Sequence, residues 1–307
     1  MAEGIPLTDK GSIAILLPEH SRPWIGFLPL VILPVTTLVL ADALAPWIFM
    51  WLLAFAIFAG CKWQTWWDAR ETHEANALRS LGYLLLWPGM DARMFLSSEN
   101  AKPRLQAGAW IRALLKAVSG LILIGIAIPF VYPKHPLGAG WMGMLGTILF
   151  LHFGTFELIS LAWRSAGVRA EPIMSRPLYS ESLAELWGKR WNLGFRTLSH
   201  TLVFRPLQKR FGAVAGILGA FLVSGLIHDL VISVPAAAGY GLPTAYFLLQ
   251  GCGVLAERSD SGKWLGMGRG TRGRMWTALV ALGPVCLLFH PWFVRRVILP
   301  FLTALVR

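Results

Sequence analysis

The amino-acid sequence predicts an all-α polytopic membrane protein with about eight transmembrane helices and additional interfacial amphipathic helices. Of its 307 residues, 55% are hydrophobic and only 14% are charged, whereas about 25% of the residues of a soluble domain carry a charge. Several apolar runs reach the length of about 18 residues that a membrane-spanning helix needs. These runs are continuous rather than alternating, which is typical of helices and not of barrel strands. We expect residues 1–307 to form a single membrane-embedded domain.

Apolar segments give the predicted spans. After a polar N-terminal lead-in (1–22), they cover residues 23–41, 43–61, 110–132, 138–163, 211–232, 240–256, 275–290 and 292–306. The lead-in lacks a basic start, an apolar run and a small-residue cleavage site, so we expect no cleavable signal peptide.

Two long polar or amphipathic regions interrupt the series of spans. The first, 62–109, begins with Trp63, Trp66 and Trp67, and such indole clusters usually lie at the level of the lipid headgroups. Its apolar run 83–90 is too short to cross a membrane, so we expect an interfacial or re-entrant segment. The second region, 164–210, contains nine Lys or Arg residues and three Glu residues.

Basic residues are distributed unevenly between the predicted loops. The net charge is +12, which in a soluble protein would suggest a nucleic-acid partner. With the N-terminus in the cytoplasm, however, cytoplasmic segments hold 25 of the 28 Lys and Arg residues, as the positive-inside rule requires. We therefore expect a multi-pass integral protein of a bacterial cytoplasmic membrane, with a cytoplasmic N-terminus and no nucleic-acid partner. The sequence does not predict an oligomeric state.

Cysteine and histidine spacing predicts no metal site. Cys61, Cys252 and Cys286 are isolated, and no two histidines have the i, i+4 spacing of metal ligands. The sequence also lacks a glycine-rich phosphate loop and a serine elbow. We expect no permanently bound cofactor.

The stretch 181–231 is where we expect the chemistry, because it contains a histidine deep in an apolar helix. His228 follows Phe211 by 17 residues, which places it roughly 25 Å along the helix. A histidine in hydrocarbon is by default a functional residue, although a hydrogen-bonded core histidine is the alternative. The adjacent Asp229 could orient the imidazole or cap a polar pocket, but neighbours on a helix point about 100° apart, so direct pairing is not expected.

Small residues precede His228 along the same helix. Gly212, Gly216, Ala220 and Ser224 recur every fourth residue, and Gly219 and Gly225 widen the stripe. Such a stripe permits close helix packing or forms a groove for an acyl chain, and the sequence alone leaves both interpretations open.

Asn192 ends a short amphipathic segment. Ser182 and Glu185 have the spacing of a capping box, so a helix is expected to begin at Ser182. Leu183, Leu186, Trp187 and Trp191 would form its apolar side. On periodicity alone, Asn192 could equally be the solvated amide of an interfacial helix.

These motifs together resemble a known enzyme family. SLAELWGKRWN at 182–192 and LVSGLIHDLV at 222–231 resemble the wax synthase-like branch of the membrane-bound O-acyltransferase superfamily. LLWPGMDAR at 85–93 and the run 152–164 are similar to the same branch, in the same order. One departure is Leu186, where the branch usually has phenylalanine.

The resemblance implies transfer of a fatty acyl group from acyl-CoA, as co-substrate, to the hydroxyl of a lipid alcohol. A long-chain fatty alcohol, giving a wax ester, is the leading acceptor, with a sterol or diacylglycerol as alternatives. The family's histidine maps onto His228 and its asparagine onto Asn192. An alcohol needs a base, and imidazole titrates near neutral pH, while an amide can stabilise the oxyanion. A lipid transporter or lipid-binding protein is the non-enzymatic alternative.

Residues flanking the two catalytic candidates are expected to bind the donor. The predicted acyl-CoA and tunnel residues are Trp187, Lys189, Arg190, Trp191, Gly216, Ser224 and Gly225. We also predict a basic rim at the cytoplasmic mouth of the tunnel, drawn from Lys189, Arg190, Arg196, Arg205, Lys209 and Arg210, because coenzyme A carries phosphates that cannot enter hydrocarbon. Arg190 could instead brace the motif by packing.

Overall fold

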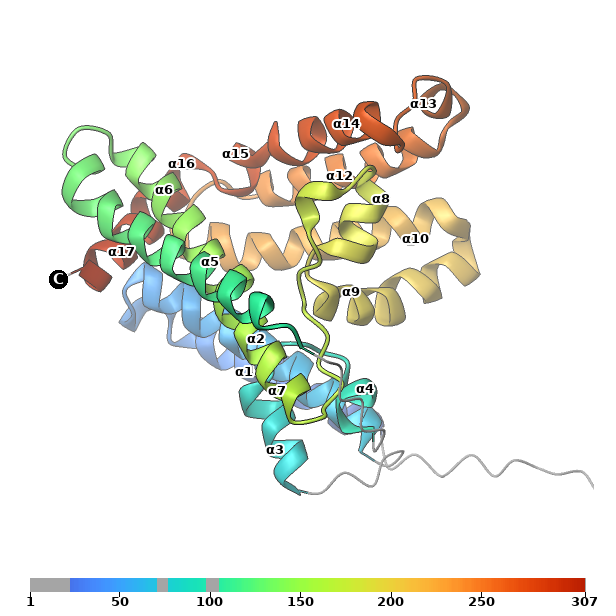
Figure 1. Cartoon of the computed structure of the whole chain (residues 1–307), viewed down its shortest axis with the longest axis horizontal. Coiled ribbons are helices and arrows are strands. Elements are labelled where there is room, and N and C mark those ends of the chain that lie inside the picture. The colour runs from blue at the N-terminus through green and yellow to red at the C-terminus, as the bar shows by residue number, and fades with distance from the viewer. Residues whose placement is uncertain (1–22, 71–76, 98–104, 307) are drawn as a thin grey trace, which may run out of the picture.

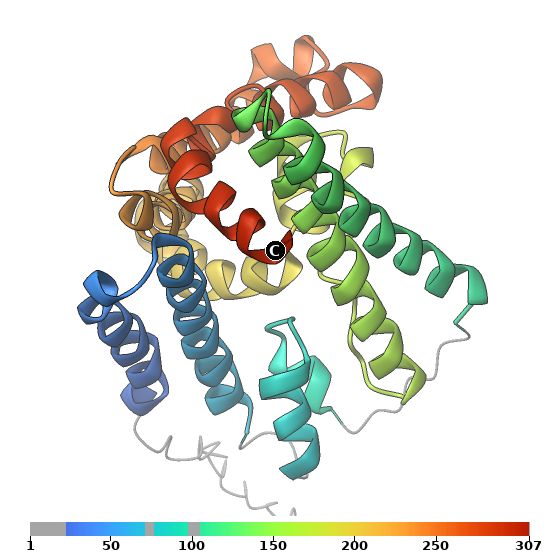
Figure 2. The same ribbon diagram turned by 90° about the vertical axis from the view of Figure 1, so that its left-hand side faces the viewer.

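The computed structural model describes residues 23–70, 77–97 and 105–306, and in these ranges the regular structure is helical throughout (Figures 1 and 2). The predicted lead-in, 1–22, lies outside the described residues. Short 3-10 and π segments are labelled η.

The helices follow one another in four groups. The first contains η1 (Pro23–Phe27), α1 (Leu28–Val39), η2 (Ala41–Ala43), α2 (Pro46–Ala69), α3 (Ala77–Leu86) and α4 (Ala92–Leu96). The second contains α5 (Ala107–Ile126), η3 (Ala127–Val131), α6 (Pro136–Ile148), η4 (Leu149–Thr155) and α7 (Phe156–Ser165). The third contains η5 (Pro177–Tyr179), α8 (Leu183–Glu185), η6 (Leu186–Arg190), α9 (Leu193–Ser199), η7 (His200–Phe204), α10 (Arg205–His228), η8 (Asp229–Ser233) and α11 (Val234–Ala236). The fourth contains α12 (Leu242–Arg258), α13 (Asp260–Trp264), α14 (Gly270–Leu282), α15 (Val285–Leu288), α16 (Pro291–Phe293), η9 (Val294–Ile298) and α17 (Leu299–Val306).

Helices that can cross a membrane confirm the predicted fold class. In the described ranges four continuous helices are long and apolar enough, and they cover Pro46–Ala69, Ala107–Val131, Pro136–Ser165 and Leu193–Ala236. A fifth is counted if Gly270–Leu288 and Pro291–Val306, which are bent by 55°, form one span. Helices also occupy the other predicted spans, but α1 and α12 are shorter than a full crossing requires. The predicted number of eight is therefore not confirmed.

Close helix pairs build the body of the fold. A Cβ on Gly60 of α2 would lie 2.8 Å from the backbone nitrogen of Leu30 in α1, and one on Gly120 of α5 would lie 2.5 Å from the carbonyl oxygen of Gly146 in α6. Figure 1 shows α1 beside α2 and α5 beside α6 and α7. Glycines at these crossings let the backbones approach closely, as in other membrane bundles.

The second helix continues beyond its predicted end. The sequence suggested that the span ends at residue 61 and that an amphipathic region begins at 62, but α2 continues to Ala69. Lys62 is therefore inside the helix, where its side chain is only 1% exposed. The short apolar run at 83–90 forms the end of α3 and a turn, in agreement with the prediction that it is too short to cross.

A break at Gly212 separates two parts of α10. Gly212 has φ 87° and ψ 172° inside this helix, a backbone conformation that is essentially restricted to glycine. The straight part that leads to His228 therefore begins after Gly212. This position agrees with the predicted start of the span at residue 211.

Candidate active site

The segment 181–192 is held in place by carboxylates. The Oγ of Ser182 accepts a hydrogen bond from the backbone N–H of Glu185 at 2.9 Å, which confirms the predicted cap. Glu257 of α12 accepts one bond from the N–H of Leu183 and one from that of Ala184, each 2.8 Å long. These N–H groups are unsatisfied at any helix start. Glu257 therefore fixes the beginning of α8 against α12.

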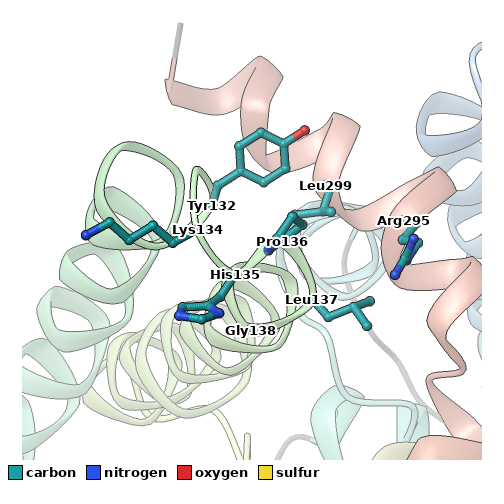
Figure 3. Close-up of a pocket in the computed structure, with 8 residues that line it drawn as sticks. All are labelled: Tyr132, Lys134, His135, Pro136, Leu137, Gly138, Arg295 and Leu299. Atoms are coloured by element: carbon teal, nitrogen blue, oxygen red, sulfur yellow. The ribbon is translucent and has the colours of Figure 1, made fainter.

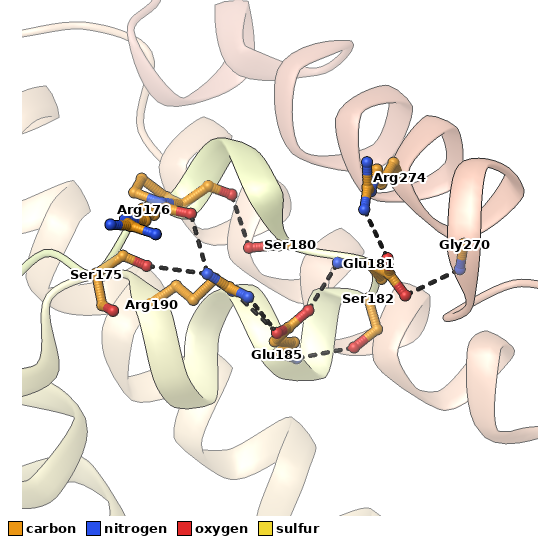
Figure 4. Close-up of polar contacts among 10 residues, drawn as sticks. Ser175, Arg176, Ser180, Glu181, Ser182, Glu185, Arg190, Gly270 and Arg274 are labelled. Atoms are coloured by element: carbon orange, nitrogen blue, oxygen red, sulfur yellow. Dashed lines mark hydrogen bonds and ion pairs between the residues drawn. The ribbon is translucent and has the colours of Figure 1, made fainter.

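Glu185 organises the other side of this segment (Figure 4). Its carboxylate accepts the backbone N–H of Glu181 at 2.7 Å, rather than the N–H of Ser182 that a reciprocal capping box would use. It also pairs with Arg190 at 2.7 Å. The guanidinium of Arg190 in turn donates to the carbonyl oxygens of Ser175 and Arg176. This geometry favours the alternative in which Arg190 braces the motif.

Glu181 ties the same segment to α14. Its carboxylate accepts the backbone N–H of Gly270 at 3.0 Å and pairs with Arg274 at 2.8 Å. The Gly270 N–H, followed by Arg274, lowers the pKa of Glu181, and the Glu181 N–H with Arg190 lowers the pKa of Glu185. A depressed carboxyl pKa means that both contacts are fully present at neutral pH and weaken only as pH falls through the lowered pKa.

Asn192 has a backbone conformation that restricts the choice of residue. It lies in the left-handed region with φ 45° and ψ 58°, which asparagine tolerates better than most residues. Its backbone N–H donates to the sulfur of Met174, and the N–H of Leu193 donates to the carbonyl oxygen of Ile173 at 2.9 Å. Asn192 thus forms the sharp turn between η6 and α9. Its side-chain amide has no hydrogen-bond partner among the described residues.

His228 is the last residue of α10, and its tautomer follows from its contact. The ring Nδ1 lies 2.7 Å from the carbonyl oxygen of Ser224. A carbonyl oxygen only accepts hydrogen bonds, so Nδ1 carries the proton and Nε2 of the neutral ring has a free lone pair. No hydrogen-bond partner of Nε2 occurs within the described ranges. The half-buried ring packs on Phe247 of α12, with 4.4 Å between ring centroids.

Aromatic side chains connect the two predicted catalytic residues. Trp187 packs on Phe247 at 5.8 Å and on Trp191 at 6.4 Å, measured between ring centroids. Its indole N–H donates to Oε1 of the fully buried Gln250 at 3.4 Å. The motif before Asn192 therefore touches the residue that covers His228. Among the described residues no hydrogen bond joins Asn192 to His228.

The family comparison covers this same segment. Residues 170–249 match the model of the membrane bound O-acyl transferase family. The matched region contains Asn192, His228 and Phe247, whereas Gln250 and Glu257 lie just beyond it.

Curated relatives carry acyltransferase names. One is the probable long-chain-alcohol O-fatty-acyltransferase 1 of Arabidopsis thaliana, which is 32% identical over 103 residues, or 30% of this chain and 29% of the relative. A second, the probable long-chain-alcohol O-fatty-acyltransferase 2 of the same plant, is 31% identical over 42% of this chain and 41% of the relative. The Arabidopsis acyl-CoA–sterol O-acyltransferase 1 is 31% identical over 28% of each chain. The chain thus spans less than half the length of these relatives.

In the segment that matches this family, Asp229 anchors α12. Its carboxylate accepts the backbone N–H of Gly241 at 2.8 Å, the N–H of Thr244 at 3.0 Å and the hydroxyl of Thr244. It also accepts the hydroxyl of Ser233 at 2.8 Å. As expected, Asp229 does not pair with the imidazole of His228. It fixes the start of the helix whose next turn carries Phe247.

Besides Glu257, sequence reasoning missed the buried side chain of Lys62. Lys62 donates to the carbonyl oxygen of Gly89 at 2.7 Å, and its Nζ lies 3.2 Å from the centroid of the Tyr83 ring. A Cβ on Gly194, two residues after Asn192, would lie 3.3 Å from the backbone nitrogen of Met90. Lys62 therefore supports the turn on which α9 begins.

His290, also missed, is completely buried beside Ser233. Its Nδ1 accepts the backbone N–H of Phe293 at 3.1 Å, and its Nε2 lies 3.4 Å from the Oγ of Ser233. The contacts of Lys62 with Gly89 and of His290 with Ser233 join residues that are distant in sequence. No local sequence pattern predicts such contacts.

Gly216 and Gly225, two of the predicted tunnel residues in the small-residue stripe, lie at tightly packed helix contacts. A Cβ on Gly225 would lie 2.7 Å from the Cα of Thr244, and one on Gly216 would lie 3.1 Å from the Phe204 ring. This favours the packing interpretation over an open acyl groove. Ser224, by contrast, contributes the carbonyl oxygen that holds His228.

We expect Gly225→Ala to lower the free energy of unfolding by about 1–3 kcal/mol, because overpacking displaces α12. Thermal unfolding of the purified protein measures this, with Gly125→Ala as the matched control, since a Cβ there meets nothing within 4 Å. Unchanged stability of Gly225→Ala, with loss of turnover only for long-chain donors, would restore the groove interpretation.

Proposed function

We propose that the protein is a membrane acyltransferase that moves a fatty acyl group from acyl-CoA to the hydroxyl of a lipid alcohol. A long-chain fatty alcohol, which gives a wax ester, is the acceptor we favour. The observation that carries the proposal is the free Nε2 of His228, oriented by the carbonyl oxygen of Ser224 within the segment that matches the acyltransferase family. The names of the curated relatives support the same reaction class.

In the proposed reaction Nε2 of His228 removes the proton of the alcohol hydroxyl. The alkoxide oxygen forms a bond to the thioester carbonyl carbon, and the carbon–sulfur bond breaks to release the coenzyme A thiolate. The imidazolium returns its proton to that sulfur, so no net proton is consumed. A positioned base of this kind typically accelerates a reaction about 10²–10⁴-fold. No covalent acyl-enzyme is required.

We propose that Asn192 contributes in two ways, through its backbone conformation and through its side-chain amide. Its left-handed backbone shapes the turn into α9, while its amide has no partner among the described residues and is available to donate to the oxyanion. A single preorganised donor to an oxyanion is worth about 10²–10³ in kcat. Trp187 and Trp191 are proposed to line the acyl path beside it.

Coenzyme A is proposed to enter beside Lys189. This side chain is exposed, as are those of Arg196, Arg205, Lys209 and Arg210. Arg190 is engaged with Glu185 and with two carbonyl oxygens, so we assign it the bracing role and leave it out of the rim. Phosphates of the donor would remain at this surface while the acyl chain reaches the bilayer interior.

The double variant Lys189→Gln/Arg196→Gln is expected to raise KM for acyl-CoA several-fold while kcat and KM for the alcohol stay within twofold. The effect should grow at low salt, where charges are least screened. Initial-rate kinetics at two ionic strengths measure it, with Lys263→Gln/Arg272→Gln as a control of equal charge change. A shift in the alcohol KM alone would mean that the rim does not receive the donor.

A sterol is the second acceptor, because one relative is named an acyl-CoA–sterol O-acyltransferase. Purified protein supplied with one acyl-CoA and, in turn, a long-chain fatty alcohol, a sterol and a diacylglycerol tests the choice. We expect the fatty alcohol to give the highest kcat/KM. If none of the three yields an ester while the protein still binds these lipids, a non-enzymatic lipid carrier becomes the better interpretation.

A further inference from the structure

A cleft lies between the turn that joins η3 to α6 and the last helices of the chain (Figure 3). Its volume is about 510 Å³, and it is lined by Tyr132, Lys134, His135, Pro136, Leu137, Gly138, Arg295 and Leu299. A second hollow of about 310 Å³ shares Tyr132, Arg295 and Leu299 and continues along α17 to Pro300, Thr303 and Ala304. The two hollows therefore form one elongated surface feature.

The polar part of the cleft is positively charged and uncompensated. Lys134 and Arg295 are both exposed, no carboxylate lines either hollow, and neither side chain forms an ion pair within the described part of the chain. The neighbouring Arg296 is different, because it donates to the carbonyl oxygens of Ala236 and Ala237. Unpaired cations around a hollow attract anions.

The remaining wall of the cleft is apolar. Leu137 and Leu299 lie between the cations, and Pro300 and Ala304 extend the apolar surface along α17. The turn 132–135 directly follows one candidate membrane span and precedes another, so it lies where a helix pair leaves the bilayer. A ligand that fits this position has an anionic head and an apolar body.

The cleft is remote from the candidate active site. Figure 1 shows the α5–α6 connection and α17 at one end of the molecule and α8 and α9 at the other. The few basic residues at this end also run against the predicted cytoplasmic bias, since Lys134, Arg295 and Arg296 are the ones assigned to the opposite side.

We propose that this cleft binds the phosphodiester headgroup of an anionic phospholipid from the surrounding leaflet. A lipid phosphodiester and free phosphate both present negatively charged phosphoryl oxygens, which arginine and lysine bind. The side chains of Lys134 and Arg295 lie on opposite sides of the group of lining residues (Figure 3), so positive charge flanks the cleft on both sides. The apolar wall receives the start of the acyl chains. This proposal is independent of the acyl-transfer reaction.

The test is native mass spectrometry of the purified full chain from nanodiscs that contain equal amounts of phosphatidylglycerol and phosphatidylcholine. We expect the wild-type protein to retain one phosphatidylglycerol preferentially. Lys134→Gln/Arg295→Gln should bind it roughly 5- to 30-fold more weakly, whereas Lys263→Gln/Arg272→Gln, with the same change in charge, should not. Equal retention of phosphatidylglycerol by the two double variants would overturn the proposal, as would equal retention of both lipids by the wild type.

A steric variant tests the cleft without changing its charge. A Cβ on Gly138 would meet only His135 and Val131, at 3.6 and 3.9 Å, so Gly138→Leu fills the cleft within a helix that tolerates leucine well. We expect it to lose the bound lipid while keeping its thermal stability, and retention of the lipid would contradict the assigned position.

A competition experiment distinguishes a lipid headgroup from free phosphate. Inorganic phosphate is added at millimolar concentration to the lipid-bound wild-type protein. If it displaces the lipid completely, the site is one for free phosphate and the lipid assignment is wrong.

Discussion

Replacing His228 by glutamine is expected to lower the kcat of acyl transfer about 10²–10⁴-fold. The glutamine amide can still donate to the carbonyl oxygen of Ser224, which the imidazole Nδ1 contacts at 2.7 Å, but it offers no basic nitrogen to the alcohol. The variant should therefore fold and insert normally. Single-turnover ester formation by the purified variant measures the effect.

His200→Ala provides the matched control for this experiment. His200 lies in the same segment but is exposed and stacks on Phe204, and we assign it no role in the proposed reaction. We expect the control to keep wild-type turnover. Turnover near the wild-type rate in His228→Gln would show that this histidine is a hydrogen-bonded packing residue, and the proposed base would have to be sought elsewhere.

The second large effect is expected at Asn192, where two variants separate backbone from amide. Asn192→Gly keeps access to the left-handed conformation at φ 45° but removes the amide, so kcat should fall about 10²-fold or more while stability changes little. Asn192→Ala removes the amide and adds backbone strain of about 1–2 kcal/mol. Both variants should lose activity, but only alanine should lower the unfolding temperature.

Kinetics and thermal unfolding of both variants decide the role of this asparagine. If Asn192→Gly keeps the wild-type kcat and Asn192→Ala does not, Asn192 acts only through the turn between η6 and α9. The oxyanion donor would then be another group. A fall in kcat for both variants, without a matching rise in KM for the alcohol, would support the amide in the transition state.

Local signals in the sequence predicted the helical fold and the parts of the site that depend on nearby residues. The spacing of Ser182 and Glu185 predicted the cap that the structure contains, and the start of the span at residue 211 coincides with the glycine break at Gly212. The helical geometry that separates adjacent side chains also predicted correctly that Asp229 would not pair with His228. These features follow from rules that operate within a few residues.

Features that depend on distant residues were not predictable in the same way. Glu257 caps α8 across a separation of 74 residues, and Lys62 reaches Gly89 across 27 residues. The sequence does not show which lysine or glutamate is buried. Burial of such a group without a partner would be costly, and the partners here are distant in sequence. The number of spans was also uncertain. Apolar runs separated 275–290 from 292–306, but they do not reveal whether the bent pair Gly270–Leu288 and Pro291–Val306 forms one span or two.

The structure also explains why the motif needs residues outside the family match. Gln250 holds the indole of Trp187, and Glu257 holds the first turn of the motif, although both follow the matched residues 170–249. The motif is therefore positioned by α12 as a whole. That helix presents Phe247 to the imidazole and is fixed at its start by Asp229.

The most direct test of the central claim follows the oxygen of the alcohol. Purified wild-type protein is supplied with acyl-CoA and a long-chain fatty alcohol labelled with heavy oxygen, and the product is identified by mass spectrometry. Attack by the alcohol on the thioester predicts an ester that retains the label, with one free coenzyme A released for each ester formed. Release of coenzyme A without labelled ester, or no reaction at all under conditions in which the protein remains folded, would contradict the account.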